Sequence, residues 1–272
     1  MSMATIILML SGLGVVVGLM LLVWLASLVQ RDASLVDRFW GLGFVILAWF
    51  WWALGPQYLS ALLPVVLVTI WGLRLSLYLT WRNWGAGEDI RYARMREKHG
   101  DGFGRVSLVT VFLLQAVVLW IVALPLFAIG QGMFNPDVMQ WVGIAGIGLW
   151  VIGFFFETIG DWQMARFRAD PANQGRVMDR GLWRYTRHPN YFGDLCVCWS
   201  IYLFSIAFGG WWTVIGPLLM SFLLVRVSGV RLLERDLVDR KPGYADYVRR
   251  TNALLPWFPR PNREGGEGSD TA

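Results

Sequence analysis

Residues that build metal centres and disulfide frameworks are scarce in this chain. Its 272 residues include two cysteines and two histidines, and Cys196 and Cys198 stand two positions apart in an apolar stretch. On a helix that spacing points the side chains to different faces, and it is too tight for an ordinary disulfide. We therefore expect both cysteines to be small buried residues, and we expect no metal site.

Charge is scarce as well, which excludes a soluble globular protein. Only 16% of the residues are charged and 56% are hydrophobic, whereas a soluble domain has about a quarter charged residues. Apolar runs of about 17 to 25 residues, the length that crosses a bilayer, explain the excess. We predict an all-α integral membrane protein surrounded by lipid, with seven spans at residues 4–29, 39–54, 58–81, 106–130, 138–160, 191–208 and 211–230.

Basic residues are missing from every second turn between these runs. Residues 55–57, 131–137 and 209–210 contain no Lys or Arg, while segments 30–38, 82–105, 161–190 and 231–272 hold nearly all of them. This alternation predicts an outside N-terminus and a cytoplasmic C-terminus. The first run lacks a basic leader and a cleavage site, so we expect a retained span. The net charge of +5 is then an orientation signal, and we expect no nucleic-acid partner.

A glycine-rich turn after a predicted strand is also absent, which excludes a Rossmann domain. Any bound nucleotide has to lie against the helical bundle. Gly143, Gly146 and Gly148 indicate instead a close helix-packing face. Residues 82–105 favour a short interfacial helix, and the Gly- and acid-rich tail at 263–272 is typical of disorder.

Ionisable residues inside the predicted spans need a partner or a task, because each costs a few kcal/mol in the membrane. Glu157 and Asp161 lie four residues apart near the end of the fifth run, so they repel one another unless cations lie opposite. Arg187 and Arg226 are the candidates for those cations. Snorkelling to the interface is the alternative for Arg168 and Arg226. Together these acids and arginines favour a polar pocket at the cytoplasmic face.

The stretch GLWRYTRHPNYFGD, residues 181–194, has the composition of an anion-binding helix start. Pro189 suits the first turn of the sixth run, where free N–H groups and the helix dipole favour an anion. Asn190 and Asp194 share a face and suit ribose hydroxyls or a carboxamide. The motif adds basic and aromatic side chains that can hold phosphates or stack on a base: Arg184, Arg187, His188, Trp183, Tyr185 and Tyr191. A lipid-headgroup anchor is the alternative interpretation.

These residues carry a family likeness. The segment FFFETIGDWQMARFRADPANQGRVMDRGLWRYTRHPNYFGD, with LLVRVSGVRLLERDL and PGYADYVRRTNALLP, resembles the C-terminal domain of the steroid 5α-reductases and sterol reductases. The whole chain, including ASLVDRFWGLGF and WGLRLSLYLTWRNWGAGEDIRY, resembles bacterial membrane proteins of unknown function that are grouped with them. A related R-H-P-x-Y pattern occurs in isoprenylcysteine and phospholipid methyltransferases, which bind S-adenosylmethionine.

The resemblance implies a seven-helix fold that holds NADPH at the cytoplasmic side. Residues 1–130 would form the substrate half and residues 131–262 the cofactor-binding domain. Positions that match the cofactor-binding pattern of the reductases are Asp161, Arg168, Tyr185, Arg187, His188, Asn190, Tyr191, Asp194 and Arg226. Glu157 and Glu234 fall on contact positions of the family with a different residue type, and Tyr247 lies where the sterol reductases also use a tyrosine.

The resemblance also suggests a substrate site in which an acid and a tyrosine polarise a ketone. By local position we expect Asp37 and Tyr78 in these catalytic roles, with Arg74 one turn before Tyr78. The expected function is NADPH-dependent reduction of the C=C bond of a hydrophobic enone, a steroid-like or isoprenoid lipid. An S-adenosylmethionine-dependent methyltransferase is the alternative, but three phosphates suit an arginine-rich site better than a sulfonium cation does. A non-enzymatic membrane scaffold or lipid sensor leaves the acids Glu157 and Asp161 unexplained.

Overall fold

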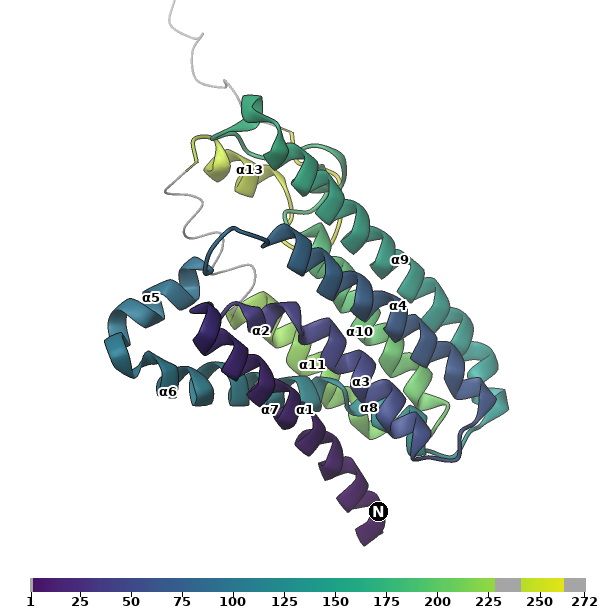
Figure 1. The fold of residues 1–272 in the computed structure, drawn as a ribbon. Helices are drawn as coiled ribbons and strands as arrows, with labels where there is room; N and C mark the ends of the chain where they lie inside the picture. Colours follow the sequence, from purple (N-terminus) through teal and green to yellow (C-terminus); the bar gives the residue numbers. More distant parts are fainter. Residues whose placement is uncertain (1, 228–240, 262–272) are drawn as a thin grey trace, which may run out of the picture. The chain divides into compact units, whose positions relative to one another are not determined.

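The computed structural model describes residues 2–227 and 241–261, and within these ranges the chain is helical and contains no β-strand (Figure 1). The chain divides into two compact units. Unit 1 comprises Met1–Trp150 and Cys198–Met220, and unit 2 comprises Val151–Val197 and Ser221–Ala272. We describe each unit by itself.

Unit 1 contains most of the helices. Its elements are α1 (Met3–Gln30), α2 (Leu35–Arg38), α3 (Trp40–Ala53), α4 (Leu59–Arg82), α5 (Ile90–His99), η1 (Gly100–Gly102), α6 (Phe103–Ser107), the π-helix η2 (Leu108–Leu113), α7 (Leu114–Val122), α8 (Leu124–Gln131) and η5 (Trp211–Val214). Helices α9 (Pro136–Ala169), α10 (Pro189–Ile206) and α11 (Ile215–Phe222) contribute residues to both units. The remaining elements, all in unit 2, are η3 (Pro171–Asn173), η4 (Gly181–Arg184), the π-helix η6 (Leu223–Val227) and α13 (Tyr244–Arg250).

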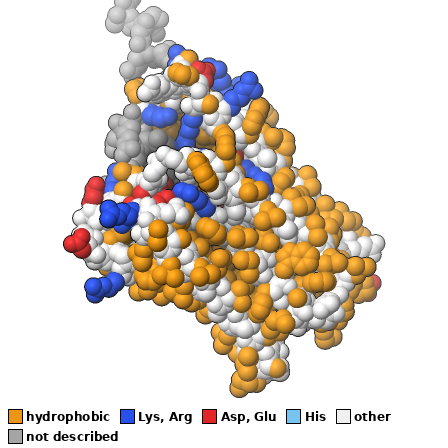
Figure 2. Space-filling view, in the orientation of Figure 1, with side chains coloured by type: hydrophobic (Ala, Val, Ile, Leu, Met, Phe, Trp, Pro, Cys, Tyr) orange, Lys and Arg blue, Asp and Glu red, His pale blue; other side chains and the backbone are white. Residues whose placement is uncertain are grey.

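Four helical stretches of the described chain are long and apolar enough to cross a membrane. They are Met3–Gln30, Leu59–Arg82, Ile90–Val122 and Pro136–Ala169, and two shorter apolar stretches cover Trp40–Ala53 and Trp211–Val227. Large hydrophobic side chains such as Leu22, Leu77 and Ile144 are exposed on these helices. Orange hydrophobic side chains cover much of the face seen in Figure 2. The predicted class, an all-α membrane protein, is confirmed at this level.

The predicted run at 106–130 is not one helix. The helical stretch begins earlier, at Ile90, and is interrupted at Ala123, after which α8 continues with Pro125 in its first turn. Proline has no N–H to donate and its ring crowds the preceding turn, so it is favoured at a helix start and tends to kink or break a helix interior. Helix α8 packs against α3 and is buried from Leu124 to Gly130.

Helices approach one another closely at glycines, but most of these glycines are not the ones that the sequence indicated. A Cβ on Gly41 would lie 2.3 Å from the carbonyl oxygen of Gly72, and this contact fixes the crossing of α3 and α4. Of the predicted packing face, Gly146 lies against the ring of Phe204, whereas a Cβ on Gly148 would meet nothing within 4 Å. Of the three glycines in the predicted packing face, only Gly146 therefore contacts another helix.

In unit 2, the second half of α9 and the first half of α10 are in near backbone contact. A Cβ on Gly153 would lie 2.6 Å from the carbonyl oxygen of Gly193, and one on Gly193 would lie 2.5 Å from that of Gly153. The rings of Phe156 and Phe192 meet edge to face at 4.9 Å, one turn away. This contact brings the acids of α9 beside the start of α10.

Candidate functional site

A tight turn between α1 and α3 positions Asp37. The helix α1 ends at Arg31, which has a left-handed backbone with φ of 53°. The carboxylate of Asp32 then accepts hydrogen bonds from the backbone N–H (2.9 Å) and the hydroxyl of Ser34, and it pairs with Arg38 at 2.9 Å. These contacts brace the short helix α2 at both ends, so that Asp37 is held at a fixed place.

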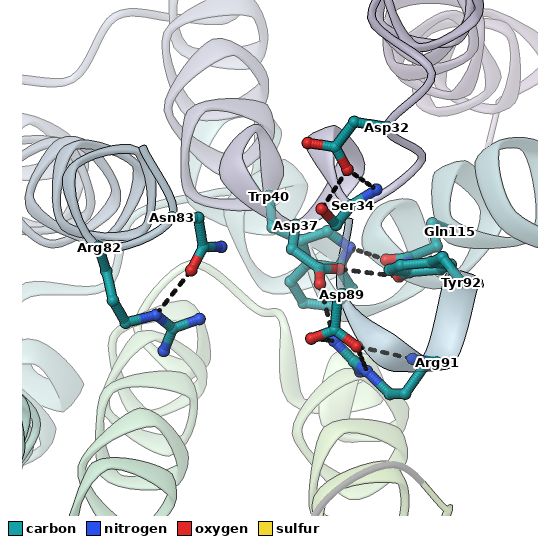
Figure 3. Close-up of polar contacts among 10 residues, drawn as sticks. All are labelled: Asp32, Ser34, Asp37, Trp40, Arg82, Asn83, Asp89, Arg91, Tyr92 and Gln115. Atoms are coloured by element: carbon teal, nitrogen blue, oxygen red, sulfur yellow. Dashed lines mark hydrogen bonds and ion pairs between the residues drawn. The ribbon is translucent and has the colours of Figure 1, made fainter. Parts of the chain in front are cut away.

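Asp37 contacts two side chains of α5 (Figure 3). The hydroxyl of Tyr92 donates to Asp37 Oδ1 at 3.0 Å, and Arg91 Nη2 forms an ion pair with Oδ2 at 2.9 Å. Arg91 is itself held by Asp89, the N-cap of α5, through Nε at 2.9 Å. Burial raises the pKa of Asp37 above its ordinary value, more than Arg91 and Tyr92 lower it. The carboxyl side chain is still 25% exposed, so one side of it remains open to solvent.

A second chain of hydrogen bonds orients Tyr92. Trp40 donates its indole N–H to Gln115 Oε1, and Gln115 Nε2 donates to the hydroxyl oxygen of Tyr92 at 3.3 Å. An indole can only donate, so it fixes the amide with its nitrogen toward Tyr92. The hydroxyl of Tyr92, which accepts from Gln115, is left to donate to Asp37. Gln115 is the second residue after the π-helix η2, and such segments are frequent at functional sites.

Glu88 clamps this cluster to the turn after α1. Its carboxylate accepts from the backbone N–H of Ala33 at 2.8 Å and from Arg96 through two nitrogens, each at 2.8 Å. Arg96 in turn lies over the ring of Phe103, 4.5 Å from its centroid. Burial raises the pKa of Glu88, but the bonds from Arg96 and Ala33 outweigh it, so the pKa is lower than usual. We call this group of residues the Asp37 cluster. It consists of Asp37, Arg91, Tyr92, Gln115 and Trp40, together with Glu88 and Arg96.

The other two residues predicted for catalysis lie on α4. The ring of Tyr78 lies between two guanidinium groups of its own helix, Arg74 at 5.1 Å and Arg82 at 5.7 Å. The tyrosine that hydrogen-bonds Asp37 is Tyr92, which the sequence placed only in an interfacial helix. Residues 30–38 and 82–105 were recognised as polar segments, but nothing in their spacing indicated that Asp37 and Tyr92 meet.

Buried ionisable residues gather in unit 2 where α9 meets α10. Glu157 and Asp161 on α9, and Arg187 and His188 just before α10, are all less than 9% exposed. Asn190 Nδ2 donates to Asp161 Oδ1 at 3.4 Å. The structure therefore brings Asp161 and Asn190, which the sequence assigned to one site, into contact.

The aromatic and amide groups of the motif continue along the start of α10. The ring of His188 stacks on that of Tyr191, with centroids 5.2 Å apart. Asp194 is half-buried one turn after Asn190, as expected for a shared face. Tyr185 is partly exposed and meets the ring of Phe258 edge to face at 5.9 Å.

Arg187 and Tyr247 have structural tasks that the sequence did not indicate. Arg187 Nη1 donates to the carbonyl oxygens of Val248, at 3.0 Å, and Thr251. The hydroxyl of Tyr247 donates to the carbonyl oxygen of Trp183. Both contacts tie α13 and the chain after it to the motif that precedes α10.

The remaining predicted cations lie at the surface of unit 2. Arg168, Arg184 and Arg226 are exposed. Lys241 donates to the carbonyl oxygen of Arg176 at 2.8 Å, and its pKa is lowered by burial and by the nearby charge of Arg168. Burial is the larger cause of this shift, and the charge of Arg168 adds to it; two cations at one place favour an anion. Glu234 lies outside the described residues.

Comparisons with known proteins give the family. Residues 23–251 match the family described as "Protein of unknown function (DUF1295)", and the chain belongs to that family. It is also 26% identical to "Uncharacterized protein C594.04c" of Schizosaccharomyces pombe over 276 residues, covering 89% of this chain and 79% of the relative. No solved structure matches the chain. The matched range includes both the Asp37 cluster and the buried residues of unit 2.

Proposed function

We propose that this member of the DUF1295 family is a membrane reductase that uses NADPH to reduce the C=C bond of a hydrophobic enone, a steroid-like or isoprenoid lipid. The observation that carries the proposal is the hydrogen bond between Tyr92 and Asp37. Reduction of an enone puts negative charge on the carbonyl oxygen, so the reaction requires a proton donor at that atom. A buried tyrosine that is backed by a carboxyl group of raised pKa suits this role.

The proton path follows from the contacts of Tyr92. When Asp37 is protonated, its O–H donates to the oxygen of Tyr92, and the hydroxyl hydrogen of Tyr92 is free to donate to the substrate oxygen. Bound NADPH would supply the hydride to the β-carbon. As the C=C electrons shift toward the carbonyl, Tyr92 protonates the oxygen and takes the proton of Asp37. The resulting enol tautomerises to the saturated ketone, and Asp37 regains a proton through its exposed side, with Arg91 stabilising the carboxylate meanwhile.

The residues of unit 2 fit a phosphorylated dinucleotide. The exposed arginines Arg168, Arg184 and Arg226 suit its phosphates, and the cation crowding around Lys241 favours such an anion. Asn190 and Asp194 suit ribose hydroxyls or the carboxamide, and Tyr185 suits a base. His188 and Tyr191 support that surface by stacking on one another. Arg187 and Tyr247, which bond backbone carbonyls, would act by holding the chain around the cofactor.

One observation favours the alternative, an S-adenosylmethionine-dependent methyltransferase. Glu157 and Asp161 are both buried one turn apart on α9. Two carboxyl groups at one site suit a sulfonium cation and an ammonium group. We rank the reductase first because the exposed cations of the same unit have no role toward a cofactor without phosphates.

Orientation is part of the proposal. Seven crossings, with the N-terminus outside and the basic segments in the cytoplasm of a bacterium, require the short helices to cross as well. Helix α3 has 14 residues, which is about 21 Å of helix against a hydrocarbon core of about 30 Å. A locally thinned bilayer or snorkelling of flanking residues would accommodate it. Labelling of single cysteines from either side in inverted and right-side-out vesicles tests each turn.

The experiment that tests the function begins with calorimetry of NADPH, NADH and S-adenosylmethionine binding to the purified protein. We expect NADPH to bind tightest; tighter S-adenosylmethionine binding reverses the ranking. NADPH oxidation is then followed with a panel of enone steroids and isoprenoid enones in detergent. Tyr92→Phe should retain NADPH binding and lose about 10²- to 10⁴-fold in turnover, the usual contribution of a general acid.

Tyr78→Phe is the matched control for that experiment, because it removes the same atom from the tyrosine that the sequence alone favours. We expect it to retain most of the turnover. If Tyr78→Phe loses activity and Tyr92→Phe does not, the Asp37 cluster is not the proton source.

A further inference from the structure

The segment after α13 exposes three large apolar side chains. Leu255 and Trp257 are each 68% exposed and Phe258 is 76% exposed. They lie outside the apolar helical stretches that are long enough to cross a membrane. Neighbouring exposed apolar residues at one surface point mark an interaction site. We call these three residues the apolar tip.

The backbone that carries the apolar tip is held in place. The hydroxyl of Thr186 donates to the carbonyl oxygen of Leu254 at 2.8 Å, and the N–H of Trp257 donates to that of Tyr185 at 2.9 Å. After the tip, the N–H of Arg260 donates to the carbonyl oxygen of Arg250 at 2.9 Å. Pro256 and Pro259 restrict the chain further. The apolar side chains are therefore presented outward on a fixed loop, with the ring of Phe258 also in contact with that of Tyr185.

The surroundings of the apolar tip are basic. Between residues 241 and 261 four basic residues stand against a single acid, Asp246. Arg249 pairs with this acid and remains 72% exposed, and Arg260 and the nearby Arg184 are also exposed. A tryptophan and other apolar side chains ringed by arginines form the combination that binds the interface of an anionic membrane.

A lipid surface is favoured over a protein partner because the membrane is already close to unit 2. Unit 2 contains the end of α9, one of the helices long enough to cross the membrane. A bilayer surface is therefore tethered to the same unit at high effective concentration, whereas a second protein has to diffuse to it. The charge complementarity of the rim also fits lipid phosphates.

We propose that the apolar tip inserts into the headgroup region of an anionic membrane, with Arg249 and Arg260 contacting lipid phosphates. This docking holds the loop at 251–260, and the motif bonded to it, at the membrane surface. The inference does not depend on the reaction that the protein catalyses.

An environment-sensitive NBD label on cysteine tests the insertion in the full chain, reconstituted in nanodiscs. The native cysteines are buried, so labelling is directed to Leu255→Cys, with Ala172→Cys in the exposed η3 turn of the same unit as the matched control. We expect the label at 255 to emit at shorter wavelength and to be quenched several-fold more by nitroxide-bearing lipids than the label at 172. Equal access of aqueous iodide to both labels overturns the proposal.

Varying the lipid composition and the number of protein copies per nanodisc tests whether a membrane or a second chain covers the apolar tip. Shielding at 255 should increase when phosphatidylglycerol is added to phosphatidylcholine, and the double variant Arg249→Gln, Arg260→Gln should lose that increase. A phosphatidylglycerol effect that survives the double variant refutes the role of these arginines. Shielding that appears only in nanodiscs loaded with two copies identifies a second chain as the occupant and overturns the membrane proposal.

Discussion

Replacing Glu88 with Gln should destabilise the protein at neutral pH and have little effect in acid. The variant puts an amide N–H₂ against Arg96 Nε, where the native carboxylate accepts a hydrogen bond at 2.8 Å. Hydrogen bonds to charged groups contribute about 1.5–3 kcal/mol, and because Arg96 is 37% exposed we take the lower part of that range. A loss of about 2 kcal/mol lowers the apparent melting temperature by about 5 °C in a chain of this size.

The sign of the pH dependence follows from the lowered pKa of Glu88. A carboxyl group with a depressed pKa in the folded state stabilises the fold above the pKa of the unfolded chain, and this contribution is lost as the pH falls through the folded value. Thermal unfolding in detergent, at one scan rate and from pH of about 7 to about 3, should show the deficit of Glu88→Gln shrinking toward acid.

For Asp37, in the same cluster, the expected pH dependence of stability has the opposite sign. Its pKa is raised by burial, so its contribution to stability is present below the unfolded pKa and is lost as the pH rises through the folded value. Asp37→Asn, which is neutral throughout, should therefore gain stability relative to the native protein as the pH rises. A deficit of Glu88→Gln that is independent of pH, or one trend shared by both variants, refutes the electrostatic account of this cluster.

Two further predictions concern packing and the C-terminal segment. Gly41→Ala should lower stability by about 3 kcal/mol, because the new Cβ would lie 2.3 Å from the carbonyl oxygen of Gly72. Gly14→Ala in α1 meets nothing within 4 Å and should instead gain about 0.5–1 kcal/mol; melting temperatures that shift in the same direction contradict this contrast. Arg187→Gln should speed amide hydrogen exchange at residues 244–252 by at least tenfold, because the guanidinium bonds two carbonyls there. Unchanged exchange by mass spectrometry assigns Arg187 another task.

The sequence predicts what the membrane environment dictates, and it misses what depends on the path of the chain. Apolar length identified α1, α4 and α9 because a bilayer demands about 20 apolar residues in succession. The break at Ala123 was missed, although Pro125 marks it. The pairing of Asp37 with Tyr92 has no local signal, because residues 55 positions apart meet only through the crossing of helices. Tyr78 was chosen by its local position, and its catalytic role stays a prediction.

In unit 2 the sequence identified which residues gather but not all of their tasks. Asn190 of the motif bonds Asp161, which lies one turn after Glu157 on α9, and Glu157, Asp161 and His188 are all buried. The bonds of Arg187 to backbone carbonyls were not predictable, because every residue carries a carbonyl group and the acceptors leave no pattern in the sequence.

Burial divides the motif at 181–194 into residues that suit a cofactor site and residues that suit a headgroup anchor. A headgroup anchor must expose its basic and aromatic side chains to lipid; Trp183, Arg187 and His188 are buried within unit 2, whereas Arg184 and Tyr185 are exposed. The exposed apolar side chains that an anchor needs occur at Leu255, Trp257 and Phe258 instead. Tyr185 and Thr186 bond the backbone of that segment, so the segment is held beside the motif. Under the two proposals made above, the segment after α13 meets the lipid, and the motif is left to hold the proposed cofactor with its histidine, amide and carboxylate at the start of α10.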